Sequence, residues 1–276
     1  MKKLLLAAFA TGLLMTAGAQ SDSTKTEQAD TIKIGGMVII KKGGKNENGD
    51  NKNVIINTDR KRRSSNVRTN WWIVDLGFAN YNDNTVYGSP AAQAIAPGFT
   101  GKDALELRTG KSVNVNIWVF MQRINLIKHA VNLKYGLGVE LNNYRFDDER
   151  IRFQKNPTKI SIDPTYANLD KNKFAADYVT VPLMLNFNLT PKKEKGFGFS
   201  AGVSGGYLYS ARQKIKTDDD KEKLRGNFDL NKFKLSYIGE LNLGPVKLYG
   251  SYATKSMWEK GLDVVPYNVG VRFGGL

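Results

Sequence analysis

Ionisable side chains recur at even spacing inside alternating stretches of this sequence, and they are the first candidates for chemistry. Alternation of apolar and polar residues puts each set on one face of an extended strand. The polar face carries charged groups of both signs: Asp75, Lys134, Glu140, Lys234, Glu240 and Arg272. Such groups can pair with one another, or they can line a path for an ion or a proton. We expect a polar network that satisfies itself, with a narrow ion or proton path as the alternative.

Residues suited to catalysis or metal binding are sparse. The single histidine, His129, follows Lys128 in a short predicted connection, away from the long loops where a surface hydrolase would need a base. The acidic runs 147–149 and 218–220 lack the spacing of a calcium loop and have basic neighbours. The glycines of 202–206 lie within a strand pattern and open no helix.

Cysteine is absent, which excludes disulfides and thiolate chemistry. From these observations we predict a non-enzymatic protein without catalytic, cofactor-binding or metal-binding residues, and with no cofactor.

The clearest alternation runs from 111 to 142, where two stretches each present one apolar and one polar face. In the first, the apolar face is Val113, Val115, Ile117, Val119 and Met121, and the other face is Asn114, Asn116, Trp118, Phe120 and Gln122. In the second, the apolar face is Val131, Leu133, Tyr135, Leu137, Val139 and Leu141. The core of a water-soluble sandwich would not accept the amides and charges of the polar face. An apolar outside around a polar inside is typical of a transmembrane β-barrel.

The alternation continues to the end of the chain and predicts eight strands. Two lie within 111–142, and the others are 71–81, 177–189, 197–211, 232–243, 246–254 and 265–273. The connections alternate between long (82–110, 144–176, 212–231 and 255–264) and short (123–129, 190–196 and Gly244-Pro245). Segregation of loop length to one end is typical of outer-membrane barrels, which keep short turns on the periplasmic side. We predict an all-β fold, an eight-stranded antiparallel up-and-down transmembrane β-barrel over 71–276, with both termini periplasmic.

The N-terminal part has a different composition. Lys2 and Lys3, the apolar stretch 4–16 and the small residues 17–19 predict a signal peptide over 1–19. Residues 20–70 are polar and basic, which predicts a flexible, mostly disordered periplasmic tail. Its β-prone pieces, 31–41 and 53–57, can pair as a short hairpin. The basic run 60–63 either attracts anionic lipid headgroups or is a solvated linker.

The formal net charge of +15 is strongly basic, as in many proteins that bind nucleic acid. No helix or zinc motif presents the positive residues, so we expect no nucleic-acid partner. Much of the charge lies in predicted loops: Lys155, Lys159, Lys171, Lys173, Lys214, Lys216, Lys221, Lys223 and Arg225. These would face an outer leaflet rich in anionic lipopolysaccharide, although solubility alone would also explain them. We expect outer-membrane lipid and lipopolysaccharide as partners, together with a periplasmic or surface protein.

Four segments of the sequence resemble the PorT-like outer membrane β-barrel domain family: 112–142, 177–188, 196–210 and 266–273. The resemblance rests on the segment 178–182, which is followed by alternating apolar residues, and on the closing strand 267–273. It covers the chain from about Trp71 onward. It implies an outer-membrane location and an eight-stranded barrel, and it brings no site residues. Asn268, Gly270 and Phe273 are similar to part of a C-terminal assembly signal, which implies the barrel assembly machinery as a partner, although residues 274–276 replace the usual terminal aromatic residue.

These observations predict a small integral outer-membrane protein, structural or partner-binding through its long outer loops or its periplasmic tail. One alternative is a narrow ion or small-solute channel through the polar lumen. A less favoured alternative is a soluble lipocalin-like carrier, whose barrel would be apolar inside and polar outside.

Overall fold

The computed structural model describes residues 30–34, 37–41, 55–57, 65–166, 169, 171–191, 196–216 and 221–274. Contacts divide the chain into two compact units, Met1–Ser64 and Ser65–Leu276. The predicted signal peptide 1–19, the basic run 60–63 and the acidic run 218–220 lie outside the described residues and stay predictions.

The first unit contains three short antiparallel strands in the order β1-β2-β3: β1 (Asp30–Ile34), β2 (Met37–Lys41) and β3 (Ile55–Asn57). We predicted that 31–41 would pair as one piece with 53–57. Instead, the first piece supplies both β1 and β2, and β3 pairs with β2.

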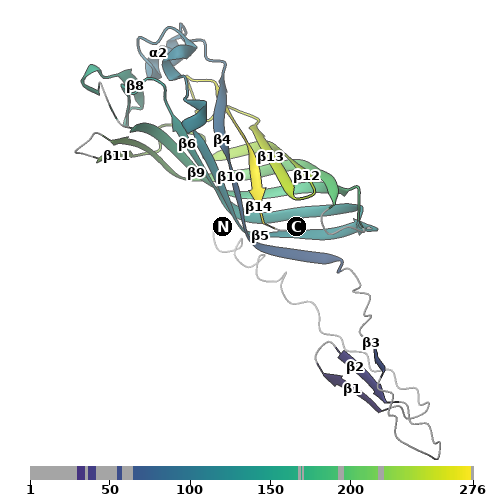
Figure 1. Cartoon of the computed structure of the whole chain (residues 1–276). Coiled ribbons are helices and arrows are strands. Elements are labelled where there is room, and N and C mark those ends of the chain that lie inside the picture. The colour runs from purple at the N-terminus through teal and green to yellow at the C-terminus, as the bar shows by residue number, and fades with distance from the viewer. Residues whose placement is uncertain are drawn as a thin grey trace, which may run out of the picture. The chain divides into compact units, whose positions relative to one another are not determined.

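The second unit is a closed ring of eight antiparallel strands (Figure 1). The strands are β4 (Val67–Asp83), β5 (Val113–Ile127), β6 (Val131–Arg145), β9 (Lys171–Asn188), β10 (Phe197–Lys216), β12 (Phe233–Leu243), β13 (Val246–Ala253) and β14 (Val264–Phe273). Each pairs with its neighbours along the chain, and β14 pairs with β4 to close the ring. The predicted eight-stranded barrel is confirmed. Several strands are longer than predicted: β4 starts before Trp71, β5 and β6 continue past their predicted ends, β9 starts before Asp177 and β10 continues past Ala211.

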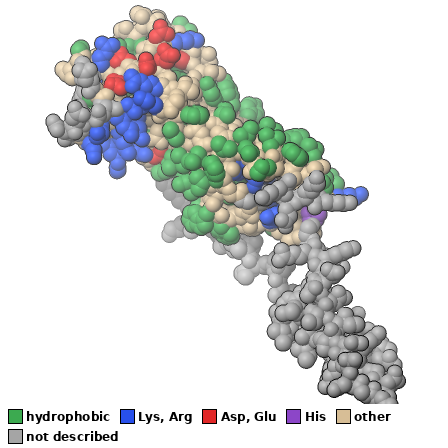
Figure 2. All heavy atoms as spheres, in the orientation of Figure 1, with side chains coloured by type: hydrophobic (Ala, Val, Ile, Leu, Met, Phe, Trp, Pro, Cys, Tyr) green, Lys and Arg blue, Asp and Glu red, His purple; other side chains and the backbone are tan. Residues whose placement is uncertain are grey.

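The two faces of the barrel have the predicted polarity. The outer face is apolar and exposed, as on β9 with Val179, Val181, Leu183 and Leu185 and on β12 with Leu235, Tyr237, Leu241 and Leu243. On the face shown in Figure 2, hydrophobic side chains gather over the wall of the barrel. The inner face is polar and buried, with Asn114, Asn116, Thr180, Asn186, Ser204, Ser236 and Asn268 beside the charged groups. This arrangement is the inverse of a lipocalin-like carrier, so that alternative is wrong.

A β-bulge in β5 reverses the predicted orientation of the side chains that follow it, Phe120, Met121 and Gln122. Against β6, Trp118 pairs with Gly138 but Phe120 pairs with Leu137, so Val119 is an extra residue in β5. After the bulge, Met121 is fully buried in the lumen, although we predicted it to face outward. Phe120, predicted to face inward, lies with its ring centroid 5.9 Å from that of the exposed Trp71. These predictions are wrong, because one inserted residue shifts an alternation of period two by one position.

The short connections gather at one end of the barrel and the long ones at the other, as predicted. The first short connection is tighter than the predicted 123–129, because β5 continues to Ile127 and β6 starts at Val131. Lys128 and His129 have φ values of 45° and 59°, as a two-residue hairpin turn of the primed type requires. His129 therefore lies in the turn, as predicted.

The long connections fold into a cap at the other end, which we define as the described residues of 84–112, 146–170, 221–232 and 254–263. Its elements are α2 (Pro90–Ile95), η2 (Lys102–Leu105), η3 (Thr109–Lys111), β7 (Ile151–Gln154), β8 (Lys159–Ile162), η4 (Pro164–Tyr166) and β11 (Lys221–Arg225). Ser89 starts α2 by accepting a hydrogen bond from the Ala92 amide at 3.2 Å, with Pro90 at the first helical position. Among the described residues, no helix is long and apolar enough to cross a membrane.

Candidate functional site

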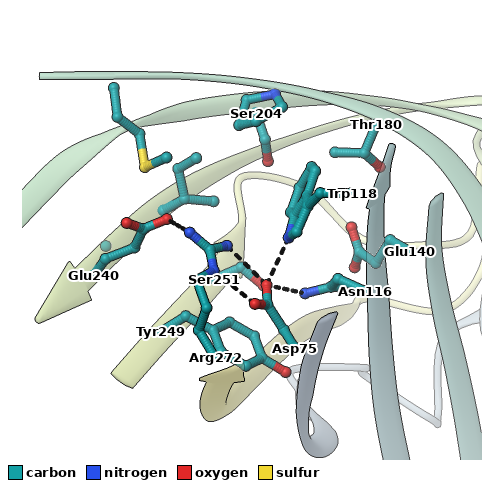
Figure 3. Close-up of a pocket in the computed structure, with 15 residues that line it drawn as sticks. Asp75, Asn116, Trp118, Glu140, Thr180, Ser204, Glu240, Tyr249, Ser251 and Arg272 are labelled. Atoms are coloured by element: carbon teal, nitrogen blue, oxygen red, sulfur yellow. Dashed lines mark hydrogen bonds and ion pairs between the residues drawn. The ribbon is translucent and has the colours of Figure 1, made fainter. Parts of the chain in front are cut away.

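A network of paired charges fills the barrel lumen (Figure 3). Arg272 on β14 binds Asp75 on β4 with two parallel contacts, Nε to Oδ1 at 2.6 Å and Nη2 to Oδ2 at 2.8 Å. A third contact joins Arg272 to Glu240 on β12. Bidentate pairing of a guanidinium with a carboxylate is among the strongest hydrogen-bonded arrangements in proteins. Arg272 therefore holds two carboxylates at once.

Two further ion pairs cross the lumen between strands that are not neighbours. Lys134 on β6 pairs with Glu240 on β12, and Lys234 on β12 pairs with Glu140 on β6. Each of these side chains is less than a tenth exposed. Because β6 and β12 are separated in the ring by β9 and β10, these pairs tie opposite parts of the wall together.

The charges of the network balance. Asp75, Glu140 and Glu240 supply three negative charges, and Lys134, Lys234 and Arg272 supply three positive charges. An ion pair removed from water is tolerated only when its geometry is good and its remaining lone pairs are bonded. All six groups were predicted to face inward, and the structure brings all six together.

Neutral side chains complete the hydrogen bonding of the carboxylates. Trp118 donates its indole N–H to Asp75 Oδ2 at 2.7 Å, and Asn116 donates to the same oxygen at 3.3 Å. Asn142 and Asn268 each donate to Glu140 Oε1 at 3.0 Å. The alternation predicted that these side chains face inward. It could not predict which carboxylate Asn116, Trp118 and Asn268 would meet, because those partners lie on different strands.

A small cavity lies among these groups. A cavity of about 30 Å³ lies between Asp75, Trp118, Thr180, Glu240 and Arg272. A volume of this size holds about one or two water molecules. The buried Thr180 hydroxyl lines it and has no hydrogen-bond partner in the protein, which makes it a natural contact for such a water. Beside the charged network, Ile73, Trp118, Met121 and Met184 pack as an apolar cluster.

The cap is built on aromatic residues that came from separate loops and were not predicted to meet. The rings of Phe153 and Phe174 stack with centroids 4.6 Å apart, and Phe228 meets both edge-on at 5.8 and 5.4 Å. Trp258 stacks on Phe174 at 6.2 Å. These rings belong to one buried cluster of the cap and the adjoining strand ends. The sequence signal was the aromatic content of the long connections, to which we assigned no role.

Two amide side chains hold the cap hairpin β7–β8 to the barrel strands. Gln213 on β10 accepts from the Phe153 amide at 2.9 Å and donates to the Ile151 carbonyl at 2.8 Å. Asn172 on β9 donates to the Glu149 carbonyl at 2.8 Å and accepts from Gln213 at 2.9 Å. Both amides are fully buried. The hairpin is therefore fixed to the wall by backbone contacts.

The acidic run 147–149 is engaged by arginine. Arg108 binds Asp147 at 3.0 Å and Glu149 at 2.9 Å, and Arg150 binds Asp148 at 2.8 Å. The hydrogen bond from Arg150 holds the pKa of Asp148 below its ordinary value. Over the described ranges, no group of three or more His, Asp or Glu side chains is arranged to hold a metal ion.

An apolar outer belt, a polar lumen and a closed antiparallel ring define an integral β-barrel membrane protein. The family model for the outer membrane protein beta-barrel domain matches residues 71–253. The chain belongs to this family and is an outer-membrane β-barrel protein.

Comparison with curated proteins found no match. Five chains of solved structures match. One is the crystal structure of Ail, the attachment invasion locus protein of Yersinia pestis, in complex with the heparin analogue sucrose octasulfate. It is 11% identical over 74% of this chain and 100% of that chain, with a TM-score of 0.30.

Proposed function

We propose that this protein is a small, non-enzymatic outer-membrane barrel that acts through its surface while its lumen stays closed to solutes. The observation that carries the proposal is the set of ion pairs that cross the lumen between β6 and β12. Each pair occupies space that a conducting path would need. An eight-stranded barrel has an interior just wide enough for side chains to fill.

The neutrality of the network supports the closed state. A pore that attracts ions usually presents an excess of one charge to the passing ion. Here three carboxylates meet three cations, and a cavity of about 30 Å³ beside them takes a water molecule rather than a solute. The channel alternative requires these pairs to open, and the free energy for that step would have to come from outside the barrel.

The absence of catalysis is also part of the proposal. His129 lies in a short turn at the opposite end from the cap, and the carboxylates of 147–149 are bound by Arg108 and Arg150. A general base needs a lone pair directed at a substrate. The folded cap, by contrast, offers a stable surface on which a partner protein can dock.

The orientation we propose puts the cap outside the cell and both termini in the periplasm, because outer-membrane barrels keep their short turns on the periplasmic side. In this arrangement, residues 1–19 are a signal peptide, 20–70 form a periplasmic tail, and the barrel assembly machinery inserts 71–276. A surface protein would meet the cap, a periplasmic protein would meet the tail, and lipopolysaccharide would surround the upper belt. We also infer membership of the PorT-like group from the strand segments 178–182 and 267–273.

Planar-bilayer recording tests the closed lumen. We expect the purified full-length protein to give no steady single-channel current, while a general porin reconstituted in the same bilayers gives clear steps. Steady unitary steps from the purified protein, inhibited when β6 and β12 are cross-linked through cysteines placed at Lys134 and Glu240, would show that the lumen conducts.

Cysteine labelling tests the orientation, because the natural sequence contains no cysteine. Lys159 in the cap and Lys128 in the short turn are both exposed. We expect Lys159→Cys to react with an impermeant maleimide in intact cells, and Lys128→Cys to react only after the outer membrane is permeabilised. The reverse pattern would contradict the orientation without affecting the closed lumen.

A further inference from the structure

Cations line up across three adjacent strands on the outer face of the barrel, above the apolar belt. The register places Lys173 of β9 opposite Lys214 of β10, and Lys214 opposite Lys223 of β11. On one side, Lys216 lies opposite Lys171 and Lys221, and on the other side Arg212 lies opposite Arg225, with Ala175 at the β9 position. We define the basic ladder as these three lysines with Lys171, Arg212, Lys216, Lys221 and Arg225. Figure 2 shows blue side chains gathered at this side of the cap, next to the green belt.

The ladder faces the same way as the lipid-facing residues. On β9, Lys173 and Lys171 continue the outward phase of Val181 and Val179, because side chains two apart share a face. The side chains that face inward beside the ladder are Asn172 and Gln213, which bind the backbone of the cap hairpin β7–β8 and of Glu149 before it. A molecule lying against the belt therefore meets the ladder on the outer surface, without entering the interior of the barrel or the cap.

The height of the ladder fits the phosphate layer of the leaflet. On β10, Tyr207 and Tyr209 are half exposed at the upper edge of the belt, where aromatic side chains mark the membrane interface. Arg212 follows three residues later, about 10 Å along the strand at roughly 3.3 Å per residue. The rungs of Lys214 and Lys216 lie higher still.

Like charges directly opposite one another destabilise a sheet, so the ladder has a cost for the isolated protein. Two acidic groups of the described residues lie close to the ladder. Asp177 binds Arg212 at the lowest rung, and Glu222 lies in register with the buried Ile215 and binds Arg152 at 3.1 Å. Desolvation together with Arg225, Lys214 and Arg212 lowers the pKa of Lys223, a sign of the crowding of positive charge. The acidic run 218–220 lies outside the described residues.

We propose that the basic ladder binds the phosphate groups of lipopolysaccharide in the outer leaflet. This inference rests on the proposed orientation, which puts the cap outside. Adjacent strands are about 4.8 Å apart, so a phosphate group can accept hydrogen bonds from ammonium groups on two neighbouring strands. Charge-assisted hydrogen bonds of this kind are strong and replace the repulsion between the rungs with attraction.

The test compares two variants that lose the same charge. The ladder variant carries Lys173→Gln, Lys214→Gln and Lys223→Gln. The matched control carries Lys102→Gln, Lys255→Gln and Lys260→Gln, three exposed cap lysines on the connections between β4 and β5 and between β13 and β14. Full-length proteins in detergent are titrated with purified lipopolysaccharide, with the same lipopolysaccharide after phosphatase treatment, and with phosphatidylglycerol.

We expect the ladder variant to bind lipopolysaccharide at least about tenfold more weakly than the natural protein, since each cation near an anionic surface contributes appreciably. The control variant should stay within about twofold. Phosphatase treatment should weaken binding to the natural protein, and phosphatidylglycerol should bind more weakly than lipopolysaccharide. Without lipid, the ladder variant should unfold at the same temperature as the natural protein or at a higher one. Addition of lipopolysaccharide should raise the unfolding temperature of the ladder variant less than that of the natural protein.

Equal losses in the ladder and control variants would overturn the proposal, because net charge alone would then explain binding. Equal affinity for phosphatidylglycerol or for phosphatase-treated lipopolysaccharide would also overturn it. A failure of the proposed orientation is distinguished by the cysteine labelling, because binding in detergent does not depend on which way the barrel is inserted.

Discussion

The lumen of the barrel and the interior of the cap are both buried, but their contents differ. The lumen is filled with paired charges and amides, and the interior of the cap is filled with aromatic rings. Along β6, the inward side chains change from Glu140 and Asn142 to Tyr144, and Phe146 follows at the end of the strand. On β9, the outward side chains change from apolar Val179 to basic Lys173 over the stretch that pairs with these residues of β6. The strands are thus apolar outside within the membrane and apolar inside above it.

This inversion follows the solvent on each side. Within the belt the outer face meets lipid, so the polar groups must turn inward and satisfy one another. Above the belt the outer face meets water and charged headgroups, so the hydrophobic effect again drives apolar groups inward. One continuous strand therefore contributes to two cores of opposite chemistry. The two cores should respond differently to substitution.

The largest effect is expected for Arg272→Met in the lumen. This change leaves Asp75 without its bidentate partner and removes one partner of Glu240. Leaving a buried charge unpaired costs about 3–5 kcal/mol. We expect a loss of that order in the free energy of unfolding of the whole barrel, measured by urea unfolding in lipid vesicles with tryptophan fluorescence.

The double variant Asp75→Asn/Arg272→Met is the matched control. It removes both charges and leaves Lys134–Glu240 and Lys234–Glu140 paired. Replacement of a whole buried pair is often close to neutral, so we expect the double variant to recover at least half of the loss. If the single and double variants are equally stable, the lumen charges do not act as a compensated set.

The next largest effect is expected for Phe153→Ala in the cap. Phe153 is fully buried against Phe146, Phe174 and Phe228, and truncation of such a ring costs about 3 kcal/mol. Because Phe153 lies on the β7–β8 hairpin and not on a barrel strand, we expect the loss to be local. Hydrogen exchange should speed up in 146–166 and stay slow in the belt part of β9.

The surface position Lys159→Ala on the same hairpin serves as its control, since this side chain is exposed and should leave exchange unchanged. Faster exchange throughout the barrel in Phe153→Ala would show that the cap and the lumen unfold as one cooperative unit. That result would end the distinction between the two cores.

The same contrast explains what the sequence could predict. The lumen charges were predictable because a period of two assigns a face to Asp75, Glu140 and Arg272 without knowledge of their partners. The orientations of Met121 and Phe120 were predicted wrongly because a β-bulge inserts one residue, and nothing in the local sequence pattern marks that residue. The extensions of β9 and β10 were missed because the polarity of the two faces inverts before Asp177 and after Tyr209, which interrupts the pattern that identified the strands. The cap cluster depends on contacts between separate loops, which no local pattern encodes.

The smallest effect is expected for Asp148→Asn on the cap surface, which sharpens the comparison because the same types of charged group pair there as in the lumen. Arg150 holds Asp148 at 2.8 Å, much as Arg272 holds Asp75, but the Arg150 side chain is half exposed. Water and salt screen such a pair, so we expect hydrogen exchange of 146–166 to change by less than about twofold at neutral pH.

The pH dependence of this small effect has a definite sign. Arg150 lowers the pKa of Asp148 in the folded protein, so the pair stabilises the cap above the ordinary aspartate pKa and is lost as the pH falls through the lowered one. The difference between the natural protein and Asp148→Asn should therefore shrink below about pH 4. A difference in exchange as large as that of Phe153→Ala, or one that grows on acidification, would mean that Asp148 is not an ordinary surface charge. The contrast between lumen and cap would then reflect more than the exclusion of water.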